Sequence, residues 1–311
     1  MLGPVESWGK TQRRKSNMDY YLQIISNIGI FITLTLSLNL INGYCGQFSL
    51  GHAGFWGVGA YASAIYGVYF ALPVDPMINM LISISVGFSA AALCGLLIGV
   101  PCLRLKGDYL AIATIGFSEI LRIIIMHTES VGGPRGFTNI PKWTNSFWVW
   151  GIVILTTIFM LNLKRSAFGR AIISIREDEV ASETMGINLF RFKLFSFIIG
   201  AGIAGIAGAL VAHDQQFLHP NNFNFMWSVC ILVMVILGGQ GSVSGSIVGA
   251  IILTLLPEIL KLIGSDISVW RMSIYSALMI ILMLTRPQGI FGPHEIFEKK
   301  RFAKKLQKGA A

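Results

Sequence analysis

The chain has 311 residues, of which 54% are hydrophobic and only 13% are charged, and its formal net charge is +9. Soluble domains carry about 25% charged residues, so the composition argues against a soluble enzyme or binding domain. Apolar runs near 20 residues recur along the sequence, and a helix of that length crosses roughly 30 Å of hydrocarbon. Alternating ten-residue segments typical of a membrane β-barrel are absent. We predict an all-α, polytopic integral membrane helical bundle.

Nine apolar runs predict membrane-spanning helices, and a charged loop separates the fifth run from the sixth. The runs are 19–41, 53–70, 77–100, 109–126, 147–163, 194–212, 226–237, 245–263 and 270–285. We therefore divide the chain into a basic cytoplasmic tail (1–18), an N-terminal transmembrane bundle (19–163), a cytoplasmic coupling loop (164–193), a C-terminal transmembrane bundle (194–287) and a second basic cytoplasmic tail (288–311). Together these parts form one membrane domain.

Two glycine-rich stretches interrupt this pattern, at 43–61 and 237–250. Both combine glycine with Gln and Ser and carry no formal charge, and paired interruptions in the two halves of a transporter indicate its pathway. The alternative is a tight turn with small residues that allow close helix packing. The candidate pathway residues are Gly43, Gly46, Gln47, Ser49, Gly51, His52, Gly238, Gly239, Gln240 and Ser242.

The distribution of Lys and Arg predicts the topology. If both tails and the loop 164–193 are cytoplasmic, 19 Lys and Arg residues lie inside and four lie outside, as the positive-inside rule requires. Two tails on one side need an even number of crossings, whereas nine runs are found. We therefore expect residues 42–52 to cross or re-enter as a short broken element, giving about nine to ten transmembrane or broken segments. The positive charge follows topology and does not predict a nucleic-acid partner.

The loop 164–193 carries ten charged side chains and must lie in water, because each would be costly at the bilayer centre. Arg176 and three acidic residues precede a stretch that ends at Gly186, and acids near a start and glycine past an end delimit a helix. We expect a short helix of about ten residues. It is either a solvated face or a lever that transmits a push from a separate motor subunit.

Few residues suggest chemistry of their own. The sequence holds no HExxH, no GxSxG and no phosphate-binding loop, so we predict no catalytic residues, no metal ligands and no cofactor in this chain. If ATP drives the protein, partner subunits bind ATP and Mg. Glu119 and Arg122 lie at i, i+3 within one run. They form either a structural ion pair at a helix interface or a polar contact of the pathway.

Several motifs together resemble the LivM-type permease subunit of branched-chain amino acid ABC importers, within the LivH/LivM permease family. The matching stretches are GYCGQFSLGHAGFWGVGAYA at 43–62, RLKGDYLAIATIGFSEILR at 104–122, GGPRGF at 132–137, SAFGRAIISIREDEVASETMGI at 166–187, LGGQGSVSGSIVGA at 237–250 and RPQGIFG at 286–292. The resemblance covers about residues 20–292.

The resemblance implies a multi-pass subunit of a prokaryotic inner (cytoplasmic) membrane that takes Leu, Ile and Val across the lipid bilayer. It also implies a second homologous permease, two cytoplasmic ATP-binding subunits and a periplasmic or lipid-anchored solute-binding protein. The family's ATPase-facing loop falls on 166–187. The coupling candidates are Arg176, Glu177, Asp178, Glu179, Glu183 and Gly186.

Three alternatives stay open at this point. Similar permeases serve urea or short-chain amides, so the substrate has two candidate classes. An ion-coupled secondary transporter or channel would need acidic residues deep in the spans, and Glu119 alone qualifies clearly. A membrane scaffold that transports nothing would need no broken segments.

Overall fold

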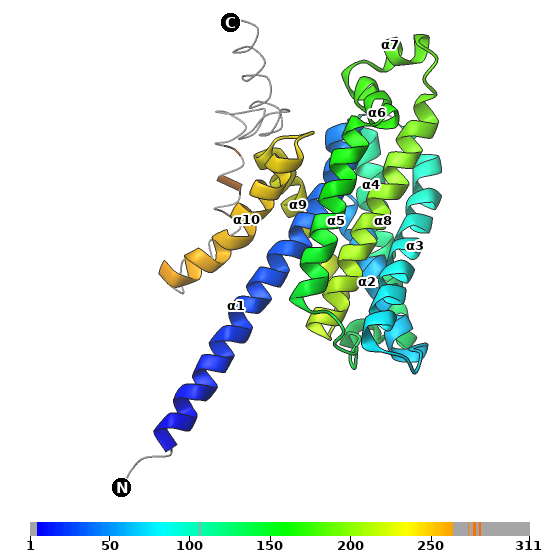
Figure 1. Ribbon diagram of the computed structural model, residues 1–311. Helices are drawn as coiled ribbons and strands as arrows, with labels where there is room; N and C mark the ends of the chain where they lie inside the picture. The colour runs from blue at the N-terminus through cyan, green and yellow to red at the C-terminus, as the bar shows by residue number, and fades with distance from the viewer. Residues whose placement is uncertain (1–4, 106, 264–272, 274–275, 278–279, 281–311) are drawn as a thin grey trace, which may run out of the picture.

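The computed structural model describes residues 5–105, 107–263, 273, 276, 277 and 280. Within these residues the chain is helical, with one isolated bridge that pairs Phe137 with Leu218. Figure 1 shows long helices side by side, with α6 and α7 at one end of the bundle. The longer elements are α1 (Val5–Leu38), α2 (His52–Tyr69), α3 (Pro76–Cys102), α4 (Asp108–His127), α5 (Ser146–Arg165), α8 (Leu189–Gln215), α9 (Phe225–Gly238) and α10 (Val243–Ile263).

The shorter elements lie in the connections. They are the π-helical turn η1 (Asn39–Tyr44), the 3-10 turns η2 (Glu129–Val131), η3 (Gly133–Arg135) and η4 (Pro220–Phe223), and the helices α6 (Ala167–Glu177) and α7 (Glu179–Thr184). Eight predicted runs correspond to helices, whereas the ninth, 270–285, lies outside the described residues apart from isolated positions, and the tail 288–311 lies outside them entirely. The prediction of a polytopic helical membrane bundle is confirmed.

Six described helical segments are long and apolar enough to cross a membrane, and a shorter apolar helix follows at Val243–Ile259. The segments Tyr20–Tyr44 and Leu189–Gln215 are the most buried of these. Helix α8 packs against α2 and α3 through glycines: a Cβ added to Gly205 would lie 2.3 Å from the Gly87 carbonyl oxygen. Small residues allow this approach between membrane helices, so the two predicted bundles share one core around α8.

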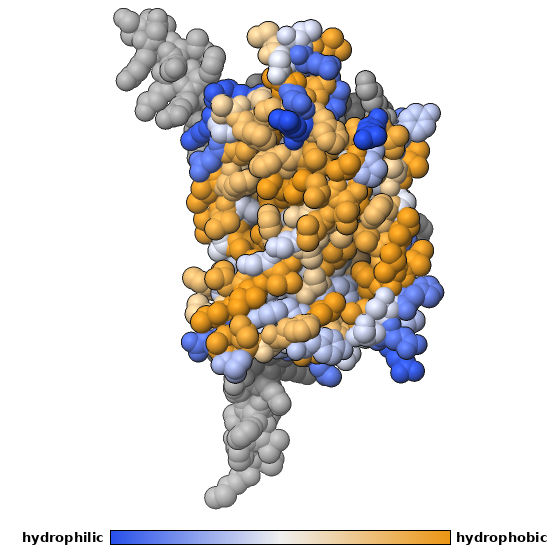
Figure 2. Space-filling model, turned by 90° about the vertical axis from the view of Figure 1, so that its right-hand side faces the viewer, coloured by the Kyte–Doolittle hydropathy of each residue, from blue (hydrophilic) through white to orange (hydrophobic). Residues whose placement is uncertain are grey.

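The outward faces of α3, α4 and α5 are apolar. Exposed side chains include Leu81, Leu93 and Leu97 on α3 and Leu155 on α5. Figure 2 shows a wide hydrophobic band on one face, with hydrophilic residues concentrated toward its two ends. An apolar band of this kind suits the hydrocarbon core of a bilayer. The chain is a multi-pass membrane protein.

The two ends of the bundle are fixed by contacts between distant segments. At one end Arg176 of α6 contacts Gly43 and Gly241, and at the other Tyr20 donates a hydrogen bond to Glu258. Helix α1 connects these ends, so its start lies opposite α6 and α7, as Figure 1 shows.

Of the two forms expected for residues 42–52, a crossing or a re-entrant element, the structure has the re-entrant one. Residues 42–44 finish the π-helical turn, 45–51 are irregular, and α2 then runs back toward the end where α1 began. The segment is broken and buried, as predicted, but it only re-enters the bundle. The start of α1 and the loop 164–193 therefore cannot both be cytoplasmic. Which of these two ends faces the cytoplasm stays a prediction.

Candidate functional site

Two of the predicted segments meet at Asn39 in the π-helical turn. The Asn39 side chain accepts a hydrogen bond from the Gly241 backbone N–H at 2.8 Å and donates one to the Ser242 carbonyl oxygen at 3.1 Å. Gly43 allows the two segments to approach this closely, because a Cβ there would lie 2.6 Å from the Gly241 nitrogen. Two stretches about 200 residues apart in the sequence therefore form one buried junction.

Arg176 connects the loop 164–193 to this junction. Its Nη1 donates a hydrogen bond to the Gly43 carbonyl oxygen at 2.7 Å, and its Nε and Nη2 contact Glu177. Gly46 and Gly241 have φ of +70° and +83°, which favour glycine. A Cβ at Gly46 would come within 2.8 Å of Arg176 Cγ, and one at Gly241 within 2.5 Å of Arg176 Nη1. The two glycines accommodate the arginine side chain.

The irregular backbone at 46–51 obtains polar partners from neighbouring helices. Asn42 exchanges two hydrogen bonds with Ser49, both at 3.3 Å, and the Leu50 N–H donates to Thr114 Oγ1 at 3.1 Å. His52 Nε2 lies 2.7 Å from Ser37 Oγ. Non-helical backbone inside a bilayer persists only with such support or beside a watery cavity.

Some polar groups of this segment are buried without a partner. Neither amide atom of Gln47 has a hydrogen-bond partner among the described residues, nor does Ser49 Oγ or His52 Nδ1. Gln47 is 4% exposed and Ser49 is fully buried. An unpaired buried polar group costs about 1–3 kcal/mol.

The second predicted segment forms a tight helical turn. A Cβ at Gly238 would lie 2.1 Å from the Gly245 carbonyl oxygen, and one at Gly249 would lie 2.2 Å from that of Met234. Ser242 Oγ accepts from the Gly245 N–H at 3.1 Å, at the start of α10. Gly239 has a φ of +112°, and Gln240 is exposed. The segment 237–250 is therefore a tight turn with close helix packing, the alternative to a pathway element given above. It also contacts the glycine-rich stretch that begins at Gly43.

Helices α6 and α7 replace the single helix of about ten residues expected in the loop. Asp178 breaks the helix, and its side chain accepts from the Ala181 N–H at 3.0 Å, which caps α7. Helix α7 has only six residues, and Gly186, with a φ of +83°, follows its end as predicted. The helix α6 that precedes the break was not predicted.

The acidic coupling candidates are largely engaged within the loop. Glu177 pairs with Arg176 at 2.5 Å, Glu179 pairs with Lys193 at 2.5 Å, and Asp178 is the cap. The exposed side chains at the tip include Val180, 72% exposed, and Met185, 83% exposed. Glu183 is exposed beside them. The tip therefore combines apolar and acidic groups.

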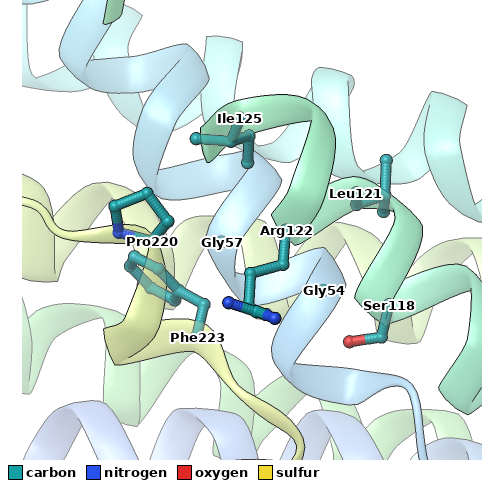
Figure 3. Close-up of a pocket in the computed structure, with 8 residues that line it drawn as sticks. All are labelled: Gly54, Gly57, Ser118, Leu121, Arg122, Ile125, Pro220 and Phe223. Atoms are coloured by element: carbon teal, nitrogen blue, oxygen red, sulfur yellow. The ribbon is translucent and has the colours of Figure 1, made fainter. Parts of the chain in front are cut away.

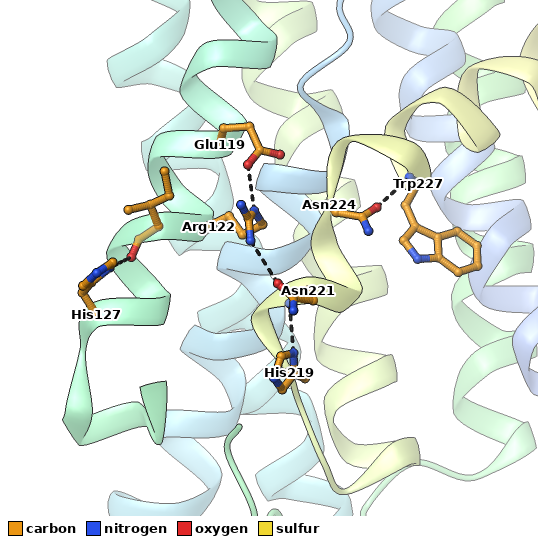
Figure 4. Close-up of polar contacts among 8 residues, drawn as sticks. Glu119, Arg122, His127, His219, Asn221, Asn224 and Trp227 are labelled. Atoms are coloured by element: carbon orange, nitrogen blue, oxygen red, sulfur yellow. Dashed lines mark hydrogen bonds and ion pairs between the residues drawn. The ribbon is translucent and has the colours of Figure 1, made fainter. Parts of the chain in front are cut away.

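A second polar cluster lies on α4. Arg122 Nε donates to Glu119 at 2.7 Å, and its Nη1 donates to Asn221 Oδ1 at 3.0 Å. Figure 4 shows the chain of contacts continuing from Asn221 to His219, where the Asn221 N–H donates to Nδ1 at 3.1 Å. The predicted pair is real, and it also ties α4 to η4.

A small pocket, with room for about one water molecule, lies beside this pair, between α2, α4 and η4. Figure 3 shows the Arg122 guanidinium between Phe223 and Ser118, with Gly54 and Gly57 on the neighbouring helix. Leu121, Ile125 and Pro220 complete the lining. Among the described residues no group of three or more His, Cys, Asp or Glu side chains is arranged to hold a metal ion.

Sequence reasoning missed several residues of both sites. Asn39 and Thr114 are polar residues within apolar runs, and Asn42 directly follows one. A polar residue inside a span is itself a signal of a functional or structural contact. Asn221 lies in a short connection, and no local pattern points to its contact with Arg122. Ser118 directly precedes Glu119 in the run and was passed over for the charged pair.

Comparison with known proteins gives the family. Residues 20–284 match the family described as "Branched-chain amino acid transport system / permease component". The high-affinity branched-chain amino acid transport system permease protein LivM of Escherichia coli K12 is 36% identical over 296 residues, which cover 84% of this chain and 67% of that protein. LivH of the same strain is 26% identical, with 89% of this chain and 97% of LivH covered.

An archaeal relative extends the likeness. The probable branched-chain amino acid transport permease protein LivM of Methanocaldococcus jannaschii is 24% identical, with 88% of this chain and 94% of the relative covered. No solved structure matches the chain. By its match over most of its length, the chain belongs to the family of branched-chain amino acid transport system permease components.

Proposed function

We propose that this chain is one membrane-spanning subunit of an ATP-driven importer in the inner membrane of a prokaryote. It works with a second homologous permease, two cytoplasmic subunits that bind ATP and Mg, and a periplasmic or lipid-anchored solute-binding protein. The solutes are Leu, Ile and Val, as the names of the LivM and LivH relatives suggest. The family and the absence of a phosphate-binding loop in the sequence both support a division of labour between chains.

The observation that carries this proposal is the contact between Arg176 and Gly43. The side chain belongs to the last turn of α6, and the carbonyl belongs to the broken segment after α1. A hydrogen bond that involves a charged group contributes about 1.5–3 kcal/mol. A displacement of α6 by an ATP-hydrolysing partner would therefore move the glycine junction directly, without passing through a flexible linker.

The exposed tip at α7 is the proposed contact with the ATP-binding subunit. Val180 and Met185 supply exposed apolar area and Glu183 supplies a charge, whereas the internally paired acids hold the loop in shape. Aromatic residues, Met and Arg are enriched at protein interfaces, and charged residues are depleted at their centres. We therefore assign the docking role mainly to Val180, Glu183 and Met185, and the shaping role to Glu177, Asp178 and Glu179.

The test is ATP-driven leucine uptake by the complete importer in proteoliposomes, with ATP hydrolysis measured in parallel. Arg176→Gln removes the charged donor and is expected to lower uptake per ATP at least tenfold, since about 1.4 kcal/mol corresponds to tenfold. Arg176→Lys is expected to retain part of the coupling. Arg170→Gln is the matched control, because Arg170 is exposed on the same helix and, among the described residues, its side chain donates to the nearby Arg165 carbonyl oxygen at 2.8 Å.

Two results would contradict the proposal. Unchanged uptake per ATP in Arg176→Gln would remove the link between α6 and the junction. Leucine uptake by this chain alone, driven by an ion gradient, would favour the secondary transporter. The close pairing of Glu119 with Arg122 does not favour that second function, because a free intramembrane acid is what proton or sodium coupling requires.

A further inference from the structure

Helix α4 carries two charged side chains at the depth of the hydrocarbon. The segment Asp108–His127 is long and apolar enough to cross a membrane. At 1.5 Å per residue, Glu119 and Arg122 lie about 17 and 21 Å along the helix from its start, within a bilayer core that is roughly 30 Å thick. Their side chains are still 32% and 23% exposed. Charged groups at this depth face protein or a water-filled space, and not lipid.

The connection between α8 and α9 brings irregular backbone to the same depth. Arg122 donates to Asn221 in η4 at 3.0 Å, and Figure 4 shows its side chain reaching from α4 to this connection. Asn221 and Asn222 are exposed, and α9 begins only at Phe225. Irregular backbone is not exposed to lipid within the hydrocarbon region. Protein or water must therefore cover this side of the chain.

An exposed line of residues on α4 passes through the charged site. The residues of this α4 line are Ile112, Gly116, Glu119 and Ile123. Their spacing of four, three and four positions places them on one helix face. Ile112 and Ile123 are exposed, and a Cβ at Gly116 would meet nothing within 4 Å among the described residues. Glycine weakens a helix relative to alanine, but between membrane helices it allows two backbones to approach closely.

The outward faces of α3 and α5 differ from the α4 line. On α3, Ser85 and Ser89 are exposed, yet each hydroxyl donates to a backbone carbonyl of its own helix, at 2.9 and 2.8 Å. On α5, the exposed Gly151 is followed by the exposed Ile154 and Ile158. These faces suit lipid because they leave no polar group without a partner. The face on α4 and η4 mixes charges and amides with exposed isoleucines, which neither lipid nor water alone would cover.

We infer that the second permease subunit packs on the face formed by the α4 line and η4. A helix of the partner approaches closest at Gly116 and places a hydrogen-bond acceptor opposite Arg122. A guanidinium has five N–H donors, and the contacts with Glu119 and Asn221 use two of them. The inference rests on the proposed function, which supplies a homologous membrane partner. Homologous subunits commonly pair through equivalent surfaces about a two-fold axis, so the partner is expected to use its own counterpart of α4.

Photo-crosslinking of the assembled importer in its membrane tests this face. With p-benzoylphenylalanine in place of Ile112 or Ile123, irradiation is expected to give an adduct with the second permease, identified by its peptides. The same replacement at Leu93 on α3 or Ile158 on α5, which are similarly exposed, is the control and is expected to give none. Adducts from the control positions alone overturn the inference. Adducts that join the α4 line to residues 264–311 of the same chain, or to a second copy of this chain, also overturn it.

Gly116→Leu tests the close approach of the two subunits. Within this chain the new side chain starts in open space and favours the helix, so the melting temperature of the purified chain is expected to stay the same or rise. Association with the second permease is expected to weaken roughly 5- to 150-fold, because an added side chain is costly at a packed contact. Energy transfer between labelled subunits, followed as lipid dilutes them in vesicles, measures this change.

Gly151→Leu on α5 is the matched control, because a Cβ there also meets nothing within 4 Å. It is expected to leave association with the second permease unchanged. Equal association of the Gly116→Leu and Gly151→Leu variants would overturn the inference.

The outcomes separate this inference from the proposed function. A wild-type importer that takes up leucine with ATP, but whose second permease crosslinks only to α3 or α5, overturns the face and leaves the function standing. If no second permease purifies with the tagged wild-type chain, the proposed subunit composition fails and this inference fails with it.

Discussion

Gly43 is the residue at which three segments converge, and its missing side chain is essential to their contact. Its carbonyl oxygen accepts from Arg176, and its Cα faces Asn39 and the Gly241 backbone. A Cβ there would lie 1.8 Å from Asn39 Oδ1, a distance that no side-chain adjustment of a few tenths of an ångström relieves. Gly43 lies in a helical turn, whose backbone angles any residue can adopt. Substitution there is therefore costly because of steric overlap and not because of backbone strain.

We predict that Gly43→Ala lowers the stability of the detergent-solubilised complex by about 1–3 kcal/mol, the usual cost of forcing an extra methyl group into a packed interior. Thermal unfolding followed by tryptophan fluorescence measures this change. Gly151→Ala in α5 is the control, because a Cβ there meets nothing within 4 Å. It should be neutral or stabilising, since alanine favours a helix by about 1 kcal/mol over glycine. Equal melting of the two variants would contradict the steric argument.

At the scale of elements, hydrophobic runs predicted the helices well and their interruptions less well. The run 77–100 became α3, Pro76–Cys102, and 194–212 became α8, Leu189–Gln215. The predicted starts are one residue late for α3, which begins at Pro76, and five residues late for α8, which begins at Leu189 after its cap Asn188. Polar residues at helix ends are missed by an apolar criterion, although caps signal them.

The loop 164–193 shows a limit of pattern reasoning. Helix α6 carries Ile172 and Ile175 on a buried face, but its basic residues merge with a longer charged run, so the sequence looked like one polar stretch. The contact between Arg176 and Gly43 joins residues 133 positions apart. No local sequence pattern indicates such a contact, because it arises from the packing of α6 against η1.

Helix α7 depends on a single cap. It has six residues, whereas isolated helices shorter than about 12–15 residues are marginal in water. We predict that Asp178→Ala, which removes the acceptor for the Ala181 N–H, destabilises α7 by about 0.5–2 kcal/mol. Hydrogen exchange of the amides at 181–184 in the full complex should accelerate roughly 2- to 30-fold.

Asp178→Asn separates capping from charge. Asparagine caps as well as aspartate, so exchange at 181–184 should stay close to that of the wild type. If both variants exchanged alike and fast, the charge of Asp178 would matter more than its hydrogen bond. If neither changed, α7 would be held by the pairing of Glu179 with Lys193 instead.

At the scale of the whole molecule, the direction of α1 changes how the charge distribution is interpreted. Counting Lys and Arg favoured one side for both tails and the loop 164–193, and that required an additional crossing at 42–52. The structure has no such crossing, because α1 spans from the Tyr20–Glu258 contact to the Arg176–Gly43 contact and α2 returns. The six basic residues of 164–193 and the four of the N-terminal tail thus lie toward opposite faces.

The positive-inside rule weighs short loops near membrane ends, so the two groups compete for the cytoplasmic side. We expect the loop 164–193 to face the cytoplasm, because its six basic residues outnumber the four of the tail. The proposed contact of α7 with an ATP-binding subunit requires the same orientation. The loops at 70–75 and 128–145, which meet where Tyr69 donates to the Ser130 carbonyl oxygen at 3.0 Å, would then face outward together with the start of α1.

Labelling of single cysteines with a membrane-impermeant maleimide tests this topology in intact cells and in inverted vesicles. With the four native cysteines replaced, Cys introduced at Glu183 is expected to react only in inverted vesicles, and Cys at Val74 only in intact cells. Cys at Tyr20, 46% exposed, decides the matter. If Cys at position 20 reacts only in intact cells, as expected at position 74, α1 crosses the membrane once and no further crossing follows at 42–52. If it reacts only in inverted vesicles, as expected at position 183, a tenth crossing is required. Labelling of position 183 from outside would leave α7 beyond the reach of any cytoplasmic ATPase.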